Sequence, residues 1–123
     1  MTALLVIAGA ALGAPLRYLV DLFVQSRHDG LMPWGTLAVN VSGSLLLGVV
    51  AGVVDATGGH EWLLALLGTG FCGALTTFST FSFETLRLLE ESAFVHAAAN
   101  VGLSVVAGVV ALFGGWSLAT TVF

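Results

Sequence analysis

The chain has 123 residues, of which 58% are hydrophobic and 8% are charged, and its formal net charge is −4. A soluble domain carries about a quarter charged residues, so this composition, with a mean hydropathy of +1.05, predicts an integral membrane protein. The three basic residues, all arginines, are too few to neutralise a nucleic-acid backbone, and a single cysteine excludes an intrachain disulfide.

Four apolar stretches are each long enough to cross a bilayer, which takes about 20 residues. They run from about Ala3 to Val24, Trp34 to Val54, Glu61 to Leu89 and Ala93 to Val122. No basic segment precedes the first stretch, so we interpret it as a retained helix and not as a signal peptide. We therefore predict an all-α protein of the cell membrane, with four transmembrane helices in a single domain, residues 1–123.

Small residues recur in the first two helices at the spacing of helix contacts. Gly9 and Gly13 form a GxxxG pair in the first helix, and Gly48 and Gly52 form another in the second. Such pairs allow helix backbones to approach closely, and we interpret them as packing residues. Four thin helices enclose little space alone, so we also expect the chain to form oligomers.

The second and fourth helices each carry a polar face. Thr36, Asn40 and Ser44 follow one another at intervals of four residues, as do Asn100 and Ser104, so each set lies on one side of its helix. A buried asparagine must face protein or water. Taken singly, each polar residue is explained equally well by hydrogen bonding between helices; together, the two faces favour the lining of a pathway.

The third helix contains the least regular stretch of the chain, Gly68 to Glu84. Its first part holds three glycines, and residues 76–84 then combine five hydroxyl residues with three interleaved phenylalanines. Helix propensity is poor in such a run, so we predict a break near the middle of the helix. A break at membrane depth must be buried or must line a polar cavity.

The residues of this stretch indicate a narrow path for a small ion. Hydroxyl and amide groups can solvate an anion, and the positive edge of an aromatic ring can face one. Phe78 and Phe81 are three residues apart and share a helix face, although ordinary core packing also explains that spacing. The carbonyls exposed by a break can instead hold a cation such as Na⁺.

The charged residues are less specific. Arg17 is costly inside a membrane unless its side chain snorkels or faces water, and Glu84 suits either a vestibule or a packing contact. The histidines have no metal-ligand spacing, and no nucleophile–base pair is evident. We therefore expect that the protein is not an enzyme.

Three motifs together resemble the Fluc/CrcB family of small fluoride channels. They are Gly-Ala-Pro-Leu-Arg-Tyr (13–18), Gly-Thr-Leu-Ala-Val-Asn-Val-Ser-Gly (35–43) and Gly-Phe-Cys-Gly-Ala-Leu-Thr-Thr-Phe-Ser-Thr-Phe-Ser-Phe-Glu (70–84). The resemblance implies passive export of fluoride, which lowers cytoplasmic fluoride. It also implies a dual-topology homodimer of two antiparallel subunits in the membrane lipid, with two pores and a structural Na⁺ at its centre.

The resemblance also assigns residues. The fluoride pathway would include Asn40, Thr77, Phe78, Ser79, Phe81, Glu84, Asn100 and Ser104. The break would span Gly73 to Thr76, and the backbone carbonyls of these two residues would bind the Na⁺. The chain departs from the family at Asn100, where a tyrosine or histidine is frequent, and at Gly108, where a hydroxyl is frequent.

Three alternatives remain open. A small proton-coupled transporter would need an acid within the membrane, and Glu84 is the one acid in the third or fourth helix that approaches such a position. A non-transporting membrane subunit would not need the hydroxyl-rich break. The loops on the two sides of the membrane differ only slightly in their number of arginines, so the positive-inside rule favours neither orientation strongly. Insertion in both orientations suits an antiparallel homodimer, and the same bias suits one half of a paired heterodimer.

Overall fold

The computed structural model describes residues 1–28 and 30–123, which form helices and, within those ranges, no β-strand. The elements in chain order are α1 (Thr2–Ser26), α2 (Trp34–Thr57), α3 (Glu61–Leu63), η1 (Leu64–Cys72), α4 (Gly73–Leu75), α5 (Phe78–Glu90) and α6 (Phe94–Val122). The elements from α3 to α5 together make the third of four segments that are long and apolar enough to cross a membrane. The prediction of an all-α chain with four such helices is confirmed.

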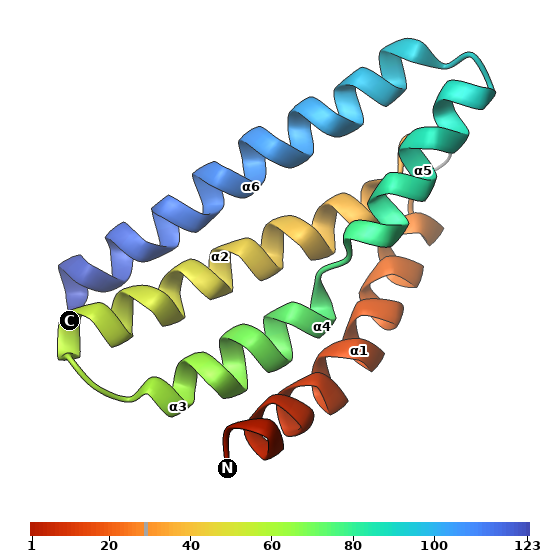
Figure 1. The fold of residues 1–123 in the computed structure, drawn as a ribbon. Coiled ribbons are helices and arrows are strands. Elements are labelled where there is room, and N and C mark those ends of the chain that lie inside the picture. The colour runs from red at the N-terminus through yellow and green to blue at the C-terminus, as the bar shows by residue number, and fades with distance from the viewer. Residues whose placement is uncertain (29) are drawn as a thin grey trace.

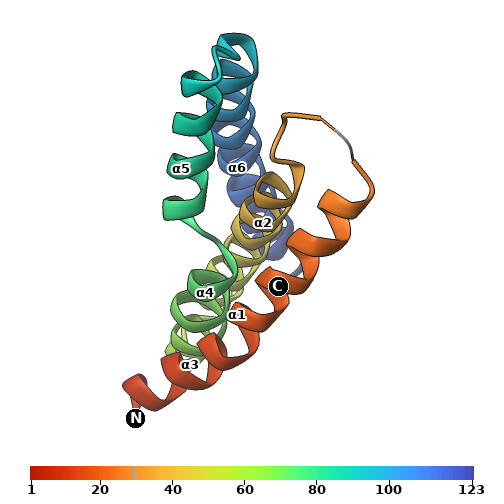
Figure 2. The same cartoon turned by 90° about the vertical axis from the view of Figure 1, so that its right-hand side faces the viewer.

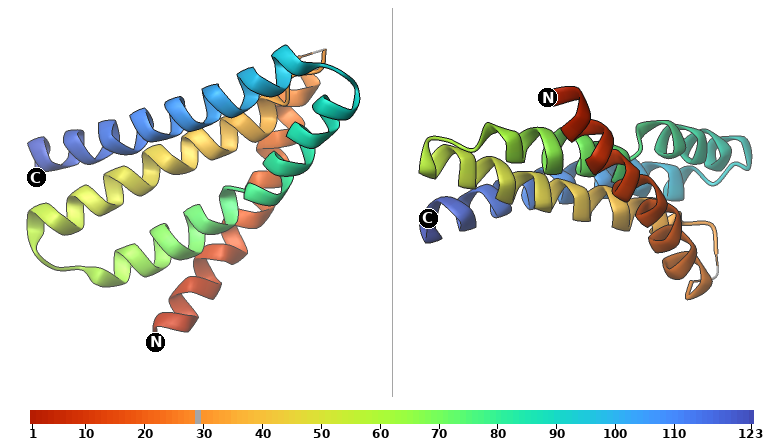
Figure 3. Two further views of the ribbon diagram at one scale, coloured as in Figure 1. Left: turned by 45° about the horizontal axis from the view of Figure 1, so that its top comes forward. Right: turned by 90° about the horizontal axis from the view of Figure 1, so that it is seen from below.

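The helices are arranged around one closely packed parallel pair, α2 and α6, whose contacts advance together along both helices, from Gly48 at Leu112 to Gly52 at Trp116. α2 and α6 run side by side, and the first half of the third segment, α3 to α4, lies along the other side of α2, whereas α5 lies toward the start of α6 (Figure 1). α1 crosses this layer at an angle (Figure 3). Both termini lie toward the end of the molecule that carries the α2–α3 connection, whereas the α5–α6 turn lies at the opposite end (Figure 1).

Glycines bring the α2 and α6 backbones together. A Cβ atom added at Gly48 would lie 2.1 Å from the carbonyl oxygen of Leu112, and one added at Gly115 would lie 2.5 Å from that of Leu45. No side chain fits at such distances, so these positions require glycine for the close approach. The packing role predicted for the glycines of the second helix is thereby confirmed.

The contact between α1 and η1 is built in the same way. A Cβ atom at Gly9 would lie 2.0 Å from the carbonyl oxygen of Leu66, and one at Gly13 would lie 2.4 Å from that of Phe71. From the other side, a Cβ atom at Gly70 would lie 2.6 Å from the carbonyl oxygen of Val6. Backbone-to-backbone contact therefore fixes the first half of the third segment against α1.

The third segment is interrupted between α4 and α5 (Figure 2). Thr76 has φ −81° and ψ 159°, and Thr77 has φ −148° and ψ 122°, so both residues are extended. The Thr77 hydroxyl oxygen accepts a hydrogen bond from the Thr80 N–H at 3.2 Å and caps α5, as threonine often does at a helix start. The predicted break near the middle of this helix is confirmed.

The position of the break and the helix before it differ from expectation. The prediction that the break begins at Gly73 is wrong, because residues 73–75 are α-helical and the extended residues are Thr76 and Thr77. Glycine permits a break but does not require one, whereas Thr77 supplies the cap of the next helix. Residues 64–72 form a π-helix, a form of helix that occurs frequently at functional sites and that the apolar pattern did not reveal.

Candidate functional site

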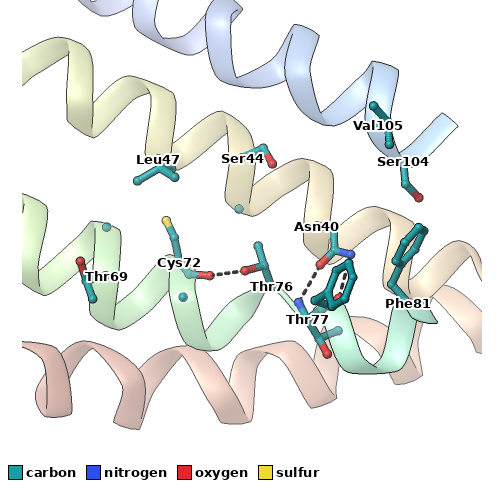
Figure 4. Close-up of a pocket in the computed structure, with 14 residues that line it drawn as sticks. Asn40, Ser44, Leu47, Thr69, Cys72, Thr76, Thr77, Phe81, Ser104 and Val105 are labelled. Carbon is teal, nitrogen blue, oxygen red and sulfur yellow. Dashed lines mark hydrogen bonds between the residues drawn. The ribbon is translucent and has the colours of Figure 1, made fainter. Parts of the chain in front are cut away.

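A single asparagine holds the break in place from α2. The Asn40 amide nitrogen Nδ2 donates to the Thr77 carbonyl oxygen at 3.1 Å, and its Oδ1 accepts from the Thr77 N–H at 2.8 Å. The side chain thus pairs with the extended backbone as a neighbouring strand would, and replaces hydrogen bonds that the broken helix has lost (Figure 4). Asn40 is therefore a structural support of the break as well as a residue of the cavity described next.

A cavity of about 610 Å³, here called the break cavity, opens beside the interruption. Its walls come from α2, η1, α4, α5 and α6 (Figure 4). The lining residues are Asn40, Gly43, Ser44, Leu47, Gly68, Thr69, Cys72, Gly73, Thr76, Thr77, Phe78, Phe81, Ser104 and Val105. Asn40 and Ser44 of the second-helix polar face thus share this cavity with Thr76 and Thr77 of the break; that an ion passes along them stays a prediction.

Two aromatic rings stand at the α5 side of the break cavity. The ring centroids of Phe78 and Phe81 are 6.0 Å apart and their planes are inclined by 43°. Phe81 is half-buried, whereas 79% of Phe78 is exposed. In a single chain the cavity is thus bordered by a ring that has no cover from the rest of the chain.

The α6 side of the cavity contributes a hydroxyl group that is not otherwise engaged. The Ser104 Oγ atom is buried and has no hydrogen-bond partner among the described residues. Figure 4 shows it beside Phe81. A buried hydroxyl without a partner carries a desolvation cost, so this oxygen is a natural contact for a polar guest in the cavity.

The carbonyl groups of Gly73 and Thr76 have the chemistry that a sodium ion requires. In a continuous helix the Gly73 carbonyl would accept from the Thr77 N–H, but that N–H donates to Asn40. The Thr76 carbonyl would accept from the Thr80 N–H, which donates to the Thr77 hydroxyl. Neither carbonyl therefore receives the helical hydrogen bond it would accept in a continuous helix, and carbonyls released at a helix break can coordinate Na⁺.

Three residues assigned to the pathway do not line the break cavity. Ser79 is exposed, and its hydroxyl lies 3.3 Å from that of Thr77. Glu84 accepts a hydrogen bond from the Thr36 hydroxyl. Asn100 is fully buried and donates through Nδ2 to the Thr85 hydroxyl at 2.8 Å. Their part in ion movement stays a prediction.

A second, smaller cavity of about 210 Å³ lies on the α1 side of the break. It is lined by Ala14, Arg17, Tyr18, Asp21, Thr36, Val39, Thr77 and Thr80. Thr77 borders both cavities, so the interruption lies between them. Asp21 and Thr80 carried no predicted role at this site, although Arg17 and Asp21 have the i, i+4 spacing that places them on one helix face.

The described residues hold no group of three or more histidine, cysteine, aspartate or glutamate side chains that could bind a metal ion. Any cation at this site would therefore depend on backbone carbonyls and not on a cluster of side chains. The break supplies such carbonyls, as argued above.

Comparison with known proteins connects this arrangement to a family. Residues 4–116 match the family model described as "CrcB-like protein, Camphor Resistance (CrcB)". The chain is 58% identical to "Fluoride-specific ion channel FluC 1" of Streptomyces avermitilis, over 94% of this chain and 93% of that protein. It is 56% identical to a protein of the same name in Frankia casuarinae, over 100% and 99%.

More distant relatives carry the same kind of name. The "Fluoride-specific ion channel FluC" of Shewanella sp. (strain ANA-3) is 46% identical over 82% of each chain. The match to the family model covers nearly all of the chain and reaches into each of the four transmembrane helices. The chain therefore belongs to the CrcB-like family and is a multi-pass integral protein of the cell membrane.

Proposed function

We propose that the protein is a fluoride-selective channel that lets fluoride leave the cell passively and so lowers cytoplasmic fluoride. The observation that carries the identity of the ion is the near-full-length similarity, up to 58% identity, to proteins named fluoride-specific ion channels. The protein is not an enzyme: the relatives are named as channels.

The geometry of the break cavity supports passage of a small anion. Fluoride is strongly hydrated, so a selective path must offer hydrogen-bond donors that replace its water. The free Ser104 hydroxyl borders the cavity on the α6 side, and the rings of Phe78 and Phe81, whose positive edges can face an anion, border it on the α5 side. Larger chloride would gain less from closely spaced donors because it cannot approach them all at once.

Two antiparallel copies are expected to complete the pathway. In one chain Phe78 is 79% exposed and Gly73 is also exposed, although both border the cavity. A second copy seated on this face would cover both residues. Two such copies would enclose two pores, one for each break cavity; a closely related partner chain would serve as well as an identical one.

A structural Na⁺ at the centre of this dimer fits the freed carbonyls of Gly73 and Thr76. Two oxygens from each copy would give four ligands, and a bound cation would neutralise the negative ends of two helices. Gly73 is exposed in a single chain, which supports a position for this residue at the interface with a second copy.

A flux experiment tests the proposal. Purified protein is placed in liposomes loaded with potassium fluoride or potassium chloride, and a K⁺ ionophore is added while an ion-selective electrode records anion release. We expect fluoride release and chloride retention. Phe81→Ile should slow fluoride release at least about tenfold, because it removes an aromatic edge from the cavity wall. Phe94→Ile, at an exposed ring outside the cavity lining, is the matched control.

Equal release of chloride would contradict selectivity, and release of neither ion would contradict the channel itself. Fluoride release that requires a proton gradient would replace the channel with an exchanger. Unchanged flux in Phe81→Ile would move the pathway away from the break cavity.

A further inference from the structure

After the break, α5 is held to the rest of the chain by a small set of polar contacts. Its start is fixed by Asn40, which pairs with Thr77. Farther along, Glu84 accepts the Thr36 hydroxyl hydrogen from α2. The contact with α6 is the hydrogen bond from Asn100 to Thr85, which is the one side-chain hydrogen bond between α5 and α6 among residues 1–28 and 30–123.

The Asn100–Thr85 hydrogen bond is linked through the Thr85 hydroxyl to Phe81, whose ring borders the break cavity. The Thr85 Oγ1 atom accepts from Asn100 Nδ2 at 2.8 Å and donates to the Phe81 carbonyl oxygen, also at 2.8 Å. Because Asn100 supplies a hydrogen, the Thr85 hydroxyl must direct its own hydrogen toward Phe81. The chain Asn100–Thr85–Phe81 therefore has a defined direction, from the buried side of α6 to the backbone of the ring that borders the cavity.

Burial makes this connection stiff. None of the Asn100 surface is exposed, and its Oδ1 atom has no partner among the described residues. A buried amide that satisfies only part of its hydrogen-bonding capacity is costly, so the bond to Thr85 offsets some of that cost. Water cannot readily replace it at a fully buried site.

We propose that Asn100 is a positioning residue that sets the place of Phe81 through Thr85, and that it does not itself contact the ion. The inference rests on the proposed function for its effect on fluoride, but its geometric part, the placement of the Phe81 ring, can be tested without any flux. Thr85, which carried no predicted role, then links Asn100 to the backbone of Phe81.

The proposal differs from the pathway role predicted for Asn100 in one testable respect. A residue that contacts the ion acts through its own amide, so Thr85 would matter little. A positioning residue acts through its partner, so loss of the Thr85 hydroxyl should reproduce loss of the Asn100 amide. Thr85→Val removes the hydroxyl and keeps the side-chain shape, whereas Thr85→Ser keeps the hydroxyl.

The experiment places 4-fluorophenylalanine at position 81 of the full chain and records its ¹⁹F resonance in detergent, in fluoride-free buffer. The variants are Asn100→Ala, Thr85→Val, Thr85→Ser and the double variant Asn100→Ala with Thr85→Val. Thr120→Val is the matched α6 control, because the Thr120 hydroxyl bonds only within its own helix. Each variant is also checked for oligomeric state and for fluoride flux in liposomes.

We expect the resonance at position 81 to shift or broaden in Asn100→Ala and in Thr85→Val, and to match the unmutated chain in Thr85→Ser and Thr120→Val. Fluoride flux should fall about three- to tenfold in the first two variants, the range set by one hydrogen bond. The double variant should be no slower than either single one, because both remove the same connection.

An unchanged resonance in Thr85→Val would overturn the proposal, even where Asn100→Ala fails to fold. Slow flux in Asn100→Ala together with normal flux and resonance in Thr85→Val would show that Asn100 acts on the ion directly. If the unmutated chain released no fluoride, the proposed function would fail, while the resonances would still decide whether Asn100 positions the ring.

Discussion

The two halves of the third membrane segment are held in place by different forces. The half before the break, η1 and α4, lies against α1 through contacts in which glycine lets one backbone touch another. The half after it, α5, buries one large apolar side chain, Leu88, and is otherwise placed by hydrogen bonds from α2 and α6 side chains. One membrane segment thus contains a part fixed by backbone contact and a part whose position depends largely on a few polar groups.

This division suits a selective path. Close backbone packing tolerates no movement without a clash, which favours a fixed centre for carbonyl ligands. The hydrogen bonds to α5 involve fewer atoms than the backbone packing of the first half, and one substitution can remove any one of these bonds. Placement of the aromatic wall is thus separable from the packing of the molecule, and three substitutions test that separation.

The largest effect is expected at the glycine contact. Gly9→Ala would place a Cβ atom 2.0 Å from the Leu66 carbonyl oxygen and 2.7 Å from the Phe71 nitrogen, which forces two backbones apart. We expect a loss of about 3 kcal/mol in unfolding free energy, seen as a lower unfolding temperature or aggregated protein in detergent. Gly102→Ala, where no atom lies within 4 Å of the added Cβ, is the control. Equal stability of the two variants would contradict the rigid first half.

A smaller effect is expected at the support of the break. Asn40→Leu leaves the Thr77 N–H and carbonyl without their partner, which should cost about 2 kcal/mol and reduce fluoride flux. Asn40→Asp retains the acceptor for the Thr77 N–H and should destabilise less. Ser42→Ala, at an exposed position of the same helix, provides the comparison in thermal unfolding and flux. If Asn40→Leu matched Ser42→Ala, the break would not depend on α2.

The smallest effect is expected at the cap of α5. Thr77→Ala removes the acceptor for the Thr80 N–H, a change that costs about 1 kcal/mol at a typical N-cap. Thr77→Ser retains the oxygen and should restore the stability. Thermal unfolding of the two variants in the same detergent measures the difference. A loss as large as that in Gly9→Ala would mean that the two halves are not separate in their energetics.

Much of this organisation could be predicted from the order of residues. Long apolar runs with few charges can be satisfied only by helices that cross a membrane, and the observed ends of the four helices lie within three residues of the predicted ones. The spacing of Gly9 with Gly13 and of Gly48 with Gly52 indicated close helix contacts, which the structure contains. Phe78, Phe81, Asn40 and Ser104 were likewise expected at one site, and all line one cavity.

The position of the break was harder to predict, because local propensity does not distinguish neighbouring residues in a run of glycines and hydroxyls. The interruption falls at Thr76 and Thr77 since α2 presents Asn40 to receive the extended backbone, a partner far away in the chain. The π-helix at residues 64–72 was missed for a related reason: an apolar run has no signal that separates it from an α-helix.

By itself, then, the sequence determined the class of protein, its four crossings and the stretch in which an ion path would form, since these follow from hydrophobicity and local propensity. Only the tertiary structure decided which polar atoms are already engaged and which are free. Asn100 and Ser104 share a helix face, yet the first is bonded to Thr85 and the second faces the cavity without a partner. Whether each group is bonded or free depends on hydrogen-bond partners in distant segments, which the spacing of residues along one helix cannot predict.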